Sequence, residues 1–241
     1  MRRRRTVGRW TIALLACAAA RAVPLSAQHP DSTPLVAVLP FANGVIGDDH
    51  AALNPLSAGL PELVRIELAR NPAVRTVEPE RMRRVLVSQH RDPQARIDDE
   101  SASHVGRILG AQSIIGGSYT SDGHGAIRIV ATEIDVASGR MAHTATVDGK
   151  QANLAALTSQ LAERIARNMR LPELPREARR DRENAQRASL ETTMMFARAI
   201  EARDAGRVQQ AISLLEQLLA QAPDYAPAQN ELARMHSERG R

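Results

Sequence analysis

One apolar run, "PLVAVLPF" at 34–41, constrains the fold of this 241-residue chain more than any other feature. It is nearly continuous and bounded by prolines, whereas a strand with one solvated face alternates apolar and polar residues. The run therefore predicts a strand that is buried on both faces. A strand of this kind is typical of a sheet that has helices packed against it.

The residues that follow predict a mixture of helices and strands. Further strands are expected at 73–79, 113–120, 126–136 and 140–149, with helices at 80–90, 101–110 and 154–169. A helix before these should begin near Ser57 to Leu60, because the interior of a helix tolerates Pro61 poorly. The order β-α-β-α-α-β-β-β-α predicts an α/β (α+β) fold, with a mixed sheet and helices packed on it.

Two helix ends carry recognisable signals. Ser101 or Ser103 is expected to cap the start of the helix at 101–110, and Gly110 is expected to end it.

The stretch "GRILGAQSIIGGSYT" at 106–120 raises the question of a phosphate-binding loop. A P-loop needs a strand, a glycine-rich turn and then a helix, with a nearby lysine, but these glycines follow a helix and the chain's one lysine is Lys150. A dinucleotide fingerprint is also absent. The hydrolase elbow G-x-S-x-G would make Ser118 a nucleophile, yet Thr120 replaces its last glycine and a hairpin replaces its helix. We therefore interpret Gly116 and Gly117 as positions of close backbone approach or of a bulge.

Other catalytic or metal-binding patterns are weak. The seven histidines form no H-x-x-x-H pair, and "GDDH" at 47–50 is expected to be a solvated loop. An enzyme would need polar groups converging near His50, Asp48 and Ser118. We predict no catalytic, metal or cofactor-binding residues, and no cofactor.

The first 27 residues resemble a secretory signal peptide. They carry six arginines and no acid, followed by the apolar stretch "WTIALLACAAA" and the small-residue site "LSA" before Gln28. Without those arginines the chain has 26 basic and 27 acidic residues, a balance that gives it no reason to bind nucleic acid. We expect cleavage after Ala27 and a periplasmic protein, with an outer-membrane association left open.

The chain's one cysteine, Cys17, lies in that segment. "LLAC" loosely resembles a lipobox, in which the cysteine receives a lipid anchor, so Cys17 is a candidate lipid-attachment residue. Otherwise the mature chain has no cysteine and no disulfide. We expect contact with a membrane only through such a lipid or through partners.

The C-terminal part predicts a helical tail. A charged linker and helix at 173–188 separate it from the α/β domain, assigned to 34–172, and the tail itself occupies 189–241. Gly206, Ala211 and Pro223 keep the spacing of a tetratricopeptide repeat, so the tail resembles that family. A plain helical hairpin is the alternative.

Four leucines crowd the second helix of the tail and form a candidate interaction surface: Leu214, Leu215, Leu218 and Leu219. We expect a third helix from "YAPAQNELARMH" to pack on them. A side left open should contact a second copy, a partner, or the α/β domain through the helix from about Arg176.

Three sequence segments also resemble those of a bacterial envelope family: "VAVLPF", "VGRILGAQSIIGGSY" and "IRIVATEIDVASGR". It includes the curli secretion lipoprotein CsgG, the flagellar protein FlgO, lipoproteins that activate penicillin-binding proteins, and the amino-terminal domain of TolB. The resemblance covers roughly 34–172 and implies a non-enzymatic domain that binds proteins or assembles. The chain departs from the family in lacking the barrel hairpins of a curli pore and the propeller of TolB.

Together these patterns predict an exported envelope scaffold or adaptor that acts by protein–protein interaction. Its expected partners are envelope proteins, with a homo-oligomer left open. The alternatives are a lipid-anchored regulator of a cell-wall synthase, an accessory of outer-membrane assembly or secretion, and a small-ligand-binding module or enzyme.

Overall fold

The apolar run at 34–41 forms β1, the second strand of a five-stranded sheet with the order β2-β1-β3-β4-β5. The computed structural model describes residues 33–89 and 98–239. Its strands are β1 (Leu35–Asn43), β2 (Arg75–Thr76), β3 (Ser113–Ser121), β4 (Ala126–Asp135) and β5 (Arg140–Lys150). β1 is parallel to both of its neighbours, β2 and β3, whereas the pairs β3–β4 and β4–β5 are antiparallel. The sheet is therefore mixed, as predicted.

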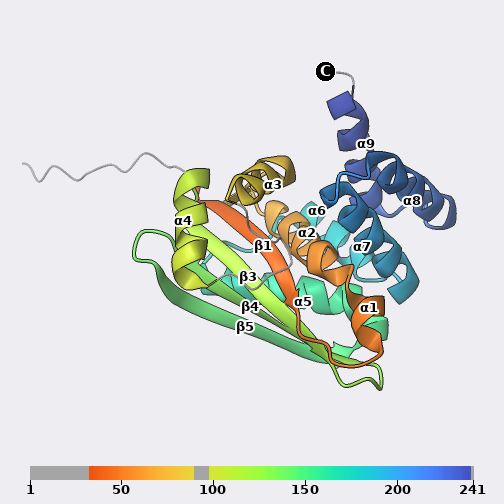
Figure 1. The fold of residues 1–241 in the computed structure, drawn as a ribbon, viewed down its shortest axis with the longest axis horizontal. Helices are drawn as coiled ribbons and strands as arrows, with labels where there is room; N and C mark the ends of the chain where they lie inside the picture. Colours follow the sequence, from red (N-terminus) through yellow and green to blue (C-terminus); the bar gives the residue numbers. More distant parts are fainter. Residues whose placement is uncertain (1–32, 90–97, 240–241) are drawn as a thin grey trace, which may run out of the picture. The chain divides into compact units, whose positions relative to one another are not determined.

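Helices pack on both faces of this sheet, which is why the residues of β1 from Leu35 to Ala42 are all apolar (Figure 1). The helices of the α/β part are α1 (Asp49–Leu53), α2 (Leu56–Ala69), α3 (Pro79–Ser88), α4 (Asp99–Leu109) and α5 (Leu154–Asn168), with a short 3-10 turn η1 (Gln151–Asn153) before α5. α2 and α5 share one apolar cluster with β1, to which Val36 contributes. α3 and α4 share the opposite cluster, to which Ala37 contributes. The fold class is confirmed.

Gly116 and Gly117, the two adjacent glycines in the stretch at 106–120, differ in what surrounds them. A Cβ on Gly117 would lie 2.6 Å from the carbonyl oxygen of Val130 and 2.8 Å from the ring of Phe41, whereas a Cβ on Gly116 would have nothing within 4 Å. β1 advances from Val38 to Phe41 while β3 advances only from Ile115 to Gly117. Close approach at Gly117 and a bulge in β1 opposite the glycines explain the motif without any ligand.

Helix α2 begins slightly earlier than predicted and contains a proline. Its first residue is Leu56, so Pro61 lies inside the helix and not at its first turn. A Cβ on Gly59 would lie 2.3 Å from the Cβ of Ala197, because α2 and α7 pack very closely at that point. Glycine at this position permits a close helix–helix contact.

The start of α4 corrects a second prediction. Asp98 is the N-cap residue, and its Oδ1 accepts a hydrogen bond from the backbone N–H of Ser101 at 2.9 Å. Neither Ser101 nor Ser103 is the cap, and Ser103 is buried in the helix. Gly110 ends the helix with φ 67°, as predicted.

The C-terminal part is helical, with α6 (Arg176–Ala185), α7 (Leu190–Asp204), α8 (Val208–Gln221) and α9 (Ala226–Arg239). Gly206 provides the turn between α7 and α8 with φ 75°. The predicted third helix is α9, and it packs against α8. Of the three contacts predicted for the tail, the structure shows the one to the α/β part. It is made mainly by α7 on α2, whereas the prediction placed it at the helix from Arg176 (Figure 1).

Within the described residues, no helix combines the length and the apolar character needed to cross a membrane. The predicted signal peptide and Cys17 lie outside the described residues.

Candidate interaction site

A buried acid lies on the side of α2 that faces the tail. Glu62 is 5% exposed, and its Oε1 accepts hydrogen bonds from Nη2 and Nε of Arg65 at 2.6 Å and 3.2 Å. Its Oε2 lies 3.6 Å from Nη2 of Arg203, a residue of α7. Burial alone would raise the pKa of Glu62, but the two guanidinium groups lower it from 4.5 to about 2. Glu62 is therefore ionised and links α2 to the tail.

Arg203 extends this link to α9. It is 6% exposed, and its Nη1 donates to Oε1 of Glu231 at 3.0 Å, while its Nε donates to Asp204 at 2.8 Å. Glu231 is 3% exposed and also accepts from Nη2 of Arg234 at 2.5 Å. Acids and arginines from three helices thus alternate in one buried network, hereafter the Arg203 network (Glu62, Arg65, Arg203, Glu231 and Arg234).

A second charged cluster ties α6 to α2. Glu67 accepts from Nε of Arg70 at 3.0 Å through Oε1 and from Nε of Arg182 at 3.0 Å through Oε2. Asp181, also on α6, lies 3.8 Å from Nη1 of Arg70 and is 66% exposed. The helix predicted within 173–188 is therefore anchored to α2, although none of its residues is fully buried.

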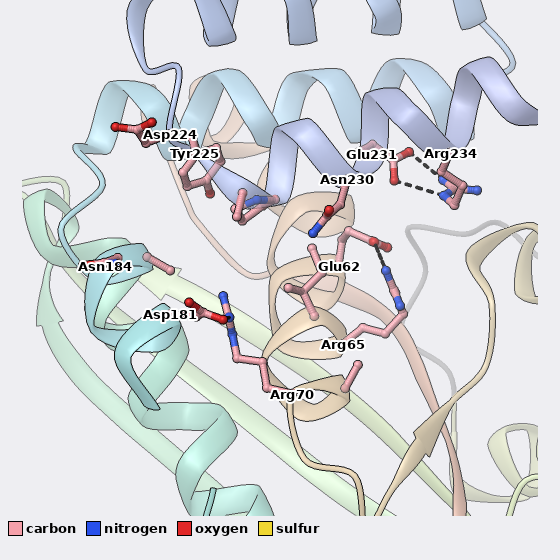
Figure 2. A pocket seen from close by; sticks show the side chains of 15 residues that line it. Glu62, Arg65, Arg70, Asp181, Asn184, Asp224, Tyr225, Asn230, Glu231 and Arg234 are labelled. Atoms are coloured by element: carbon pink, nitrogen blue, oxygen red, sulfur yellow. Dashed lines mark hydrogen bonds and ion pairs between the residues drawn. The ribbon is translucent and has the colours of Figure 1, made fainter. Parts of the chain in front are cut away.

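These two clusters border a groove of about 470 Å³ between α2, α6 and α9, which Figure 2 shows from close by. The lining residues are Glu62, Arg65, Ile66, Ala69, Arg70, Asp181, Asn184, Ala185, Asp224, Tyr225, Ala226, Pro227, Asn230, Glu231 and Arg234. Most of its charged side chains are paired with one another. The carboxamides of Asn184 and Asn230 are exposed, and neither has a hydrogen-bond partner within the described part of the chain.

The lining of this groove is rich in hydrogen-bonding groups. Its lining contains no serine, cysteine, histidine or lysine. The arginines there are held by carboxylates, so they present hydrogen-bonding edges rather than free charge. Each carboxamide offers both donors and an acceptor, which are the groups that a peptide backbone requires. The arrangement suits a polar segment of another protein.

The residues considered for an enzyme do not form a site. Asp48, just before α1, and His50, on α1, are both exposed, and the hydrogen bonds of His50 involve its backbone, with Gly47 and with the Asn43 side chain. Ser118 lines a separate cavity of about 570 Å³ on the sheet, which includes neither Asp48 nor His50. No hydrogen bond or ion pair joins these three residues. Among residues 33–89 and 98–239, no group of three or more histidines, cysteines or acids is placed to hold a metal.

The four predicted leucines have two different surroundings. Leu215 and Leu218 are 0% and 1% exposed in the core of the tail. Leu214 and Leu219 are half-buried at the edge of that core, so an interaction surface remains a prediction for these two alone. Sequence reasoning missed the Arg203 network. The available signal was a pair of charged residues, Arg203 and Glu231, at positions where the apolar helical pattern expects core residues.

Comparison with known protein families finds a match in the tail. The sequence profile of the tetratricopeptide repeat matches residues 202–241. No protein of curated function matches the chain.

Among solved structures, the C-terminal domain of LpoB from Escherichia coli is 16% identical, covering 52% of this chain and 89% of its own, with a TM-score of 0.38. TolB from Acinetobacter baumannii is 14% identical, covering 58% of this chain and 28% of its own, with a TM-score of 0.38. The PelC dodecamer from Paraburkholderia phytofirmans is 15% identical, covering 59% of this chain and 91% of its own, with a TM-score of 0.36.

Proposed function

We propose that this protein is an exported adaptor of the bacterial cell envelope that binds a segment of another protein in the groove between α2, α6 and α9. The single observation that carries the proposal is the groove itself. It combines a floor of mutually paired charges with the free carboxamides of Asn184 and Asn230 at its edge. The repeat match at 202–241 supports the same kind of function, because α9 supplies one wall.

The paired floor favours binding over catalysis. The carboxylates of Glu62 and Glu231 are committed to arginines and are less than 6% exposed. A general acid or base needs a proton that it can exchange near neutral pH. The pKa of Glu62 is far too low for that. We therefore propose a non-enzymatic role.

Export is the second part of the proposal. It rests on the basic and apolar pattern of residues 1–27 and on the resemblance of 34–172 to the CsgG and FlgO family. In this proposal the α/β domain of 34–172 and the tail of 189–241 are separate evolutionary units that pack together. Gln28 should be the mature N-terminus, which mass spectrometry of the purified protein would show.

The alternative is a lipid-anchored regulator of a cell-wall synthase or an accessory of outer-membrane assembly or secretion. It is favoured by Cys17, whose sequence context resembles a lipobox. Metabolic labelling with a clickable fatty acid tests this alternative. Label that disappears in Cys17→Ser would establish the anchor, and an unlabelled wild-type protein would reject it.

Site-specific photo-crosslinking tests the adaptor function. A photoreactive phenylalanine at Asn230 places the crosslinker at the groove, and the same residue at Glu216 on the exposed side of α8 is the matched control. We expect a discrete crosslinked envelope protein from position 230 only. Identical products from both positions, or none from position 230, would contradict the proposal.

A further inference from the structure

A small apolar hollow, separate from the groove, lies between α2, α3 and the end of α7. It has a volume of about 80 Å³, and its walls are mostly aliphatic side chains from β1, α2 and α3: Val38, Pro40, Ala58, Pro61, Pro79 and Val87. Val87 is 63% exposed, so a large apolar side chain at the hollow is left in contact with solvent. Because apolar walls offer water few hydrogen bonds, this hollow, hereafter the Pro61 hollow, suits an aliphatic side chain from outside better than it suits water.

The chain itself presents such a side chain elsewhere on its surface. Ile46 is 92% exposed, the highest value among the large apolar residues of the described ranges. Its loop is held in place by Asn43, which accepts from the backbone N–H of Val45 at 3.0 Å and donates to the carbonyl oxygen of His50 at 3.0 Å. Val45 is buried. The loop therefore presents Ile46 in a fixed position, which lowers the entropy lost when that side chain binds.

Arginines with unused donors lie at the α3 side of the hollow. Glu80 is bonded by Nη2 of Arg83 alone, at 2.8 Å and 3.1 Å. Nε of Arg83 is buried without a partner, and no hydrogen bond to Nη1 is found within residues 33–89 and 98–239. Arg84 is exposed one turn before Val87 and forms no ion pair in that part of the chain. The hollow's rim therefore offers donors to an incoming acid.

The loop of Ile46 carries matching acceptors. Asp48 and Asp49 follow Ile46, and neither forms an ion pair with any residue that the structure describes. Carboxylates are acceptors only, whereas guanidinium groups are donors only. The acids that line the hollow itself, Glu62 and Asp204, do not oppose these carboxylates strongly, because Arg203 holds both of them. The loop and the hollow are thus complementary in apolar character and in charge.

We infer that the occupant of the Pro61 hollow is Ile46 of a second copy of this chain, with Asp48 and Asp49 of that copy facing Arg83 and Arg84. Figure 1 shows α1, which follows the loop, well apart from α3, so one molecule cannot fill its own hollow. The contact is head-to-tail: each copy gives its loop to one neighbour and receives the loop of another. This self-association is additional to the proposed adaptor function and does not depend on it.

Sedimentation equilibrium of the purified protein, from micromolar to millimolar concentration, tests the inference. We expect the average mass to rise above that of the monomer as the concentration increases. Ile46→Asp and Val87→Asp should each raise the concentration needed for association at least about ten-fold, because each replaces an aliphatic side chain in the contact by a charge. Ile46→Asp should leave the unfolding temperature unchanged, since the side chain is exposed in the monomer.

A mixture of the two variants tests the head-to-tail geometry. Ile46→Asp keeps the hollow and loses the apolar tip of the loop, whereas Val87→Asp keeps the loop and alters the hollow. Each variant alone should be monomeric at a concentration at which the wild type associates. An equimolar mixture should form a dimer with one copy of each variant and nothing larger, because only one loop and one hollow remain intact.

Met141→Asp is the matched control. Met141 is also an exposed apolar residue, at 56%, but it lies on β5 and does not line the Pro61 hollow, so its replacement should leave the association unchanged. A wild-type protein that stays monomeric over the whole range would overturn the inference. The same holds for association that Ile46→Asp leaves intact, for a mixture that stays monomeric, and for an equal loss in Met141→Asp.

Discussion

The two sides of α2 are both buried, but by different means. Toward the sheet, Leu60, Val64 and Leu68 are at most 2% exposed in an apolar cluster. Toward the tail, Gly59 and Leu63 permit close packing, and beside them Glu62 enters the Arg203 network. An apolar contact tolerates small shifts of one helix against another, whereas a network of paired charges is satisfied in one arrangement only. The comparison suggests that the sheet side provides stability and the tail side fixes the geometry of the groove.

Removal of Arg203, on the tail side of α2, should cause the largest loss in the free energy of unfolding. Arg203→Ala leaves Glu62 without its partner on α7 and Glu231 with Arg234 alone, both of them buried. We expect a loss of about 3–5 kcal/mol in the free energy of unfolding, measured by urea denaturation. The control Arg198→Ala, on the exposed side of the same helix, should change it by less than about 0.5 kcal/mol. A loss equally small for Arg203→Ala would show that the network has no structural role.

Matched leucine deletions compare the two cores directly. Leu60→Ala opens a cavity on the sheet side and Leu218→Ala opens one within the tail, at side chains that are 0% and 1% exposed. Each should cost about 2–5 kcal/mol. Thermal unfolding of both variants should remain a single transition, because α2 belongs to both cores. A separate early transition in Leu218→Ala alone would mean that the tail unfolds independently.

Acid should weaken the tail side selectively. The pKa of Glu62 falls from 4.5 to about 2 on folding, so the stability it contributes is present above pH 4.5 and is lost as the pH falls toward 2. The amount is about 3 kcal/mol. Stability curves measured from about pH 6 down to about pH 2 should therefore be flatter for Glu62→Gln than for the wild type. Parallel curves would contradict the assignment.

Alanine substitutions at three glycines should have smaller effects on the free energy of unfolding, and they can be compared position by position. Gly59→Ala places a methyl group against Ala197 on the tail side, and Gly117→Ala places one against Val130 and Phe41 within the sheet. Each should cost about 1–3 kcal/mol by overpacking. Gly116→Ala is the control, since nothing lies within 4 Å of the added Cβ. A cost for Gly116→Ala as large as for Gly117→Ala would refute the structural account of the glycine motif.

The sheet side could be predicted from the sequence because its signals are local. The run at 34–41 and the apolar spacing in α5 depend on neighbouring residues, and both predictions were confirmed. The start of α2 was placed late because Pro61 was assigned to a first turn, whereas the helix begins at Leu56 and contains Pro61 in its interior. The predicted caps at Ser101 or Ser103 failed because the helix begins earlier, with Asp98 as the N-cap that accepts from the backbone N–H of Ser101.

The groove could not be predicted, because its parts are distant in the sequence. Glu62 and Arg203 meet only when α7 docks on α2. The helical pattern marks Arg203 as a core position, but it does not identify the residue that Arg203 pairs with. The sequence predicts that four leucines crowd α8. Which of them are buried and which are half-buried depends on the packing of α9 and α2. The sequence does predict the match to the tetratricopeptide repeat, since Gly206 and Pro223 keep the spacing of that repeat.

Calorimetry of the chain with and without its tail tests the central claim that α2 and α7–α9 form one unit with the groove between them. The two chains to compare cover residues 33–241 and 33–188. We predict that the shorter chain unfolds at a lower temperature, because it exposes Leu63 and leaves Glu62 without Arg203. An unchanged unfolding temperature and enthalpy per residue in the shorter chain would show that the tail is an independent appendage, and would contradict this account.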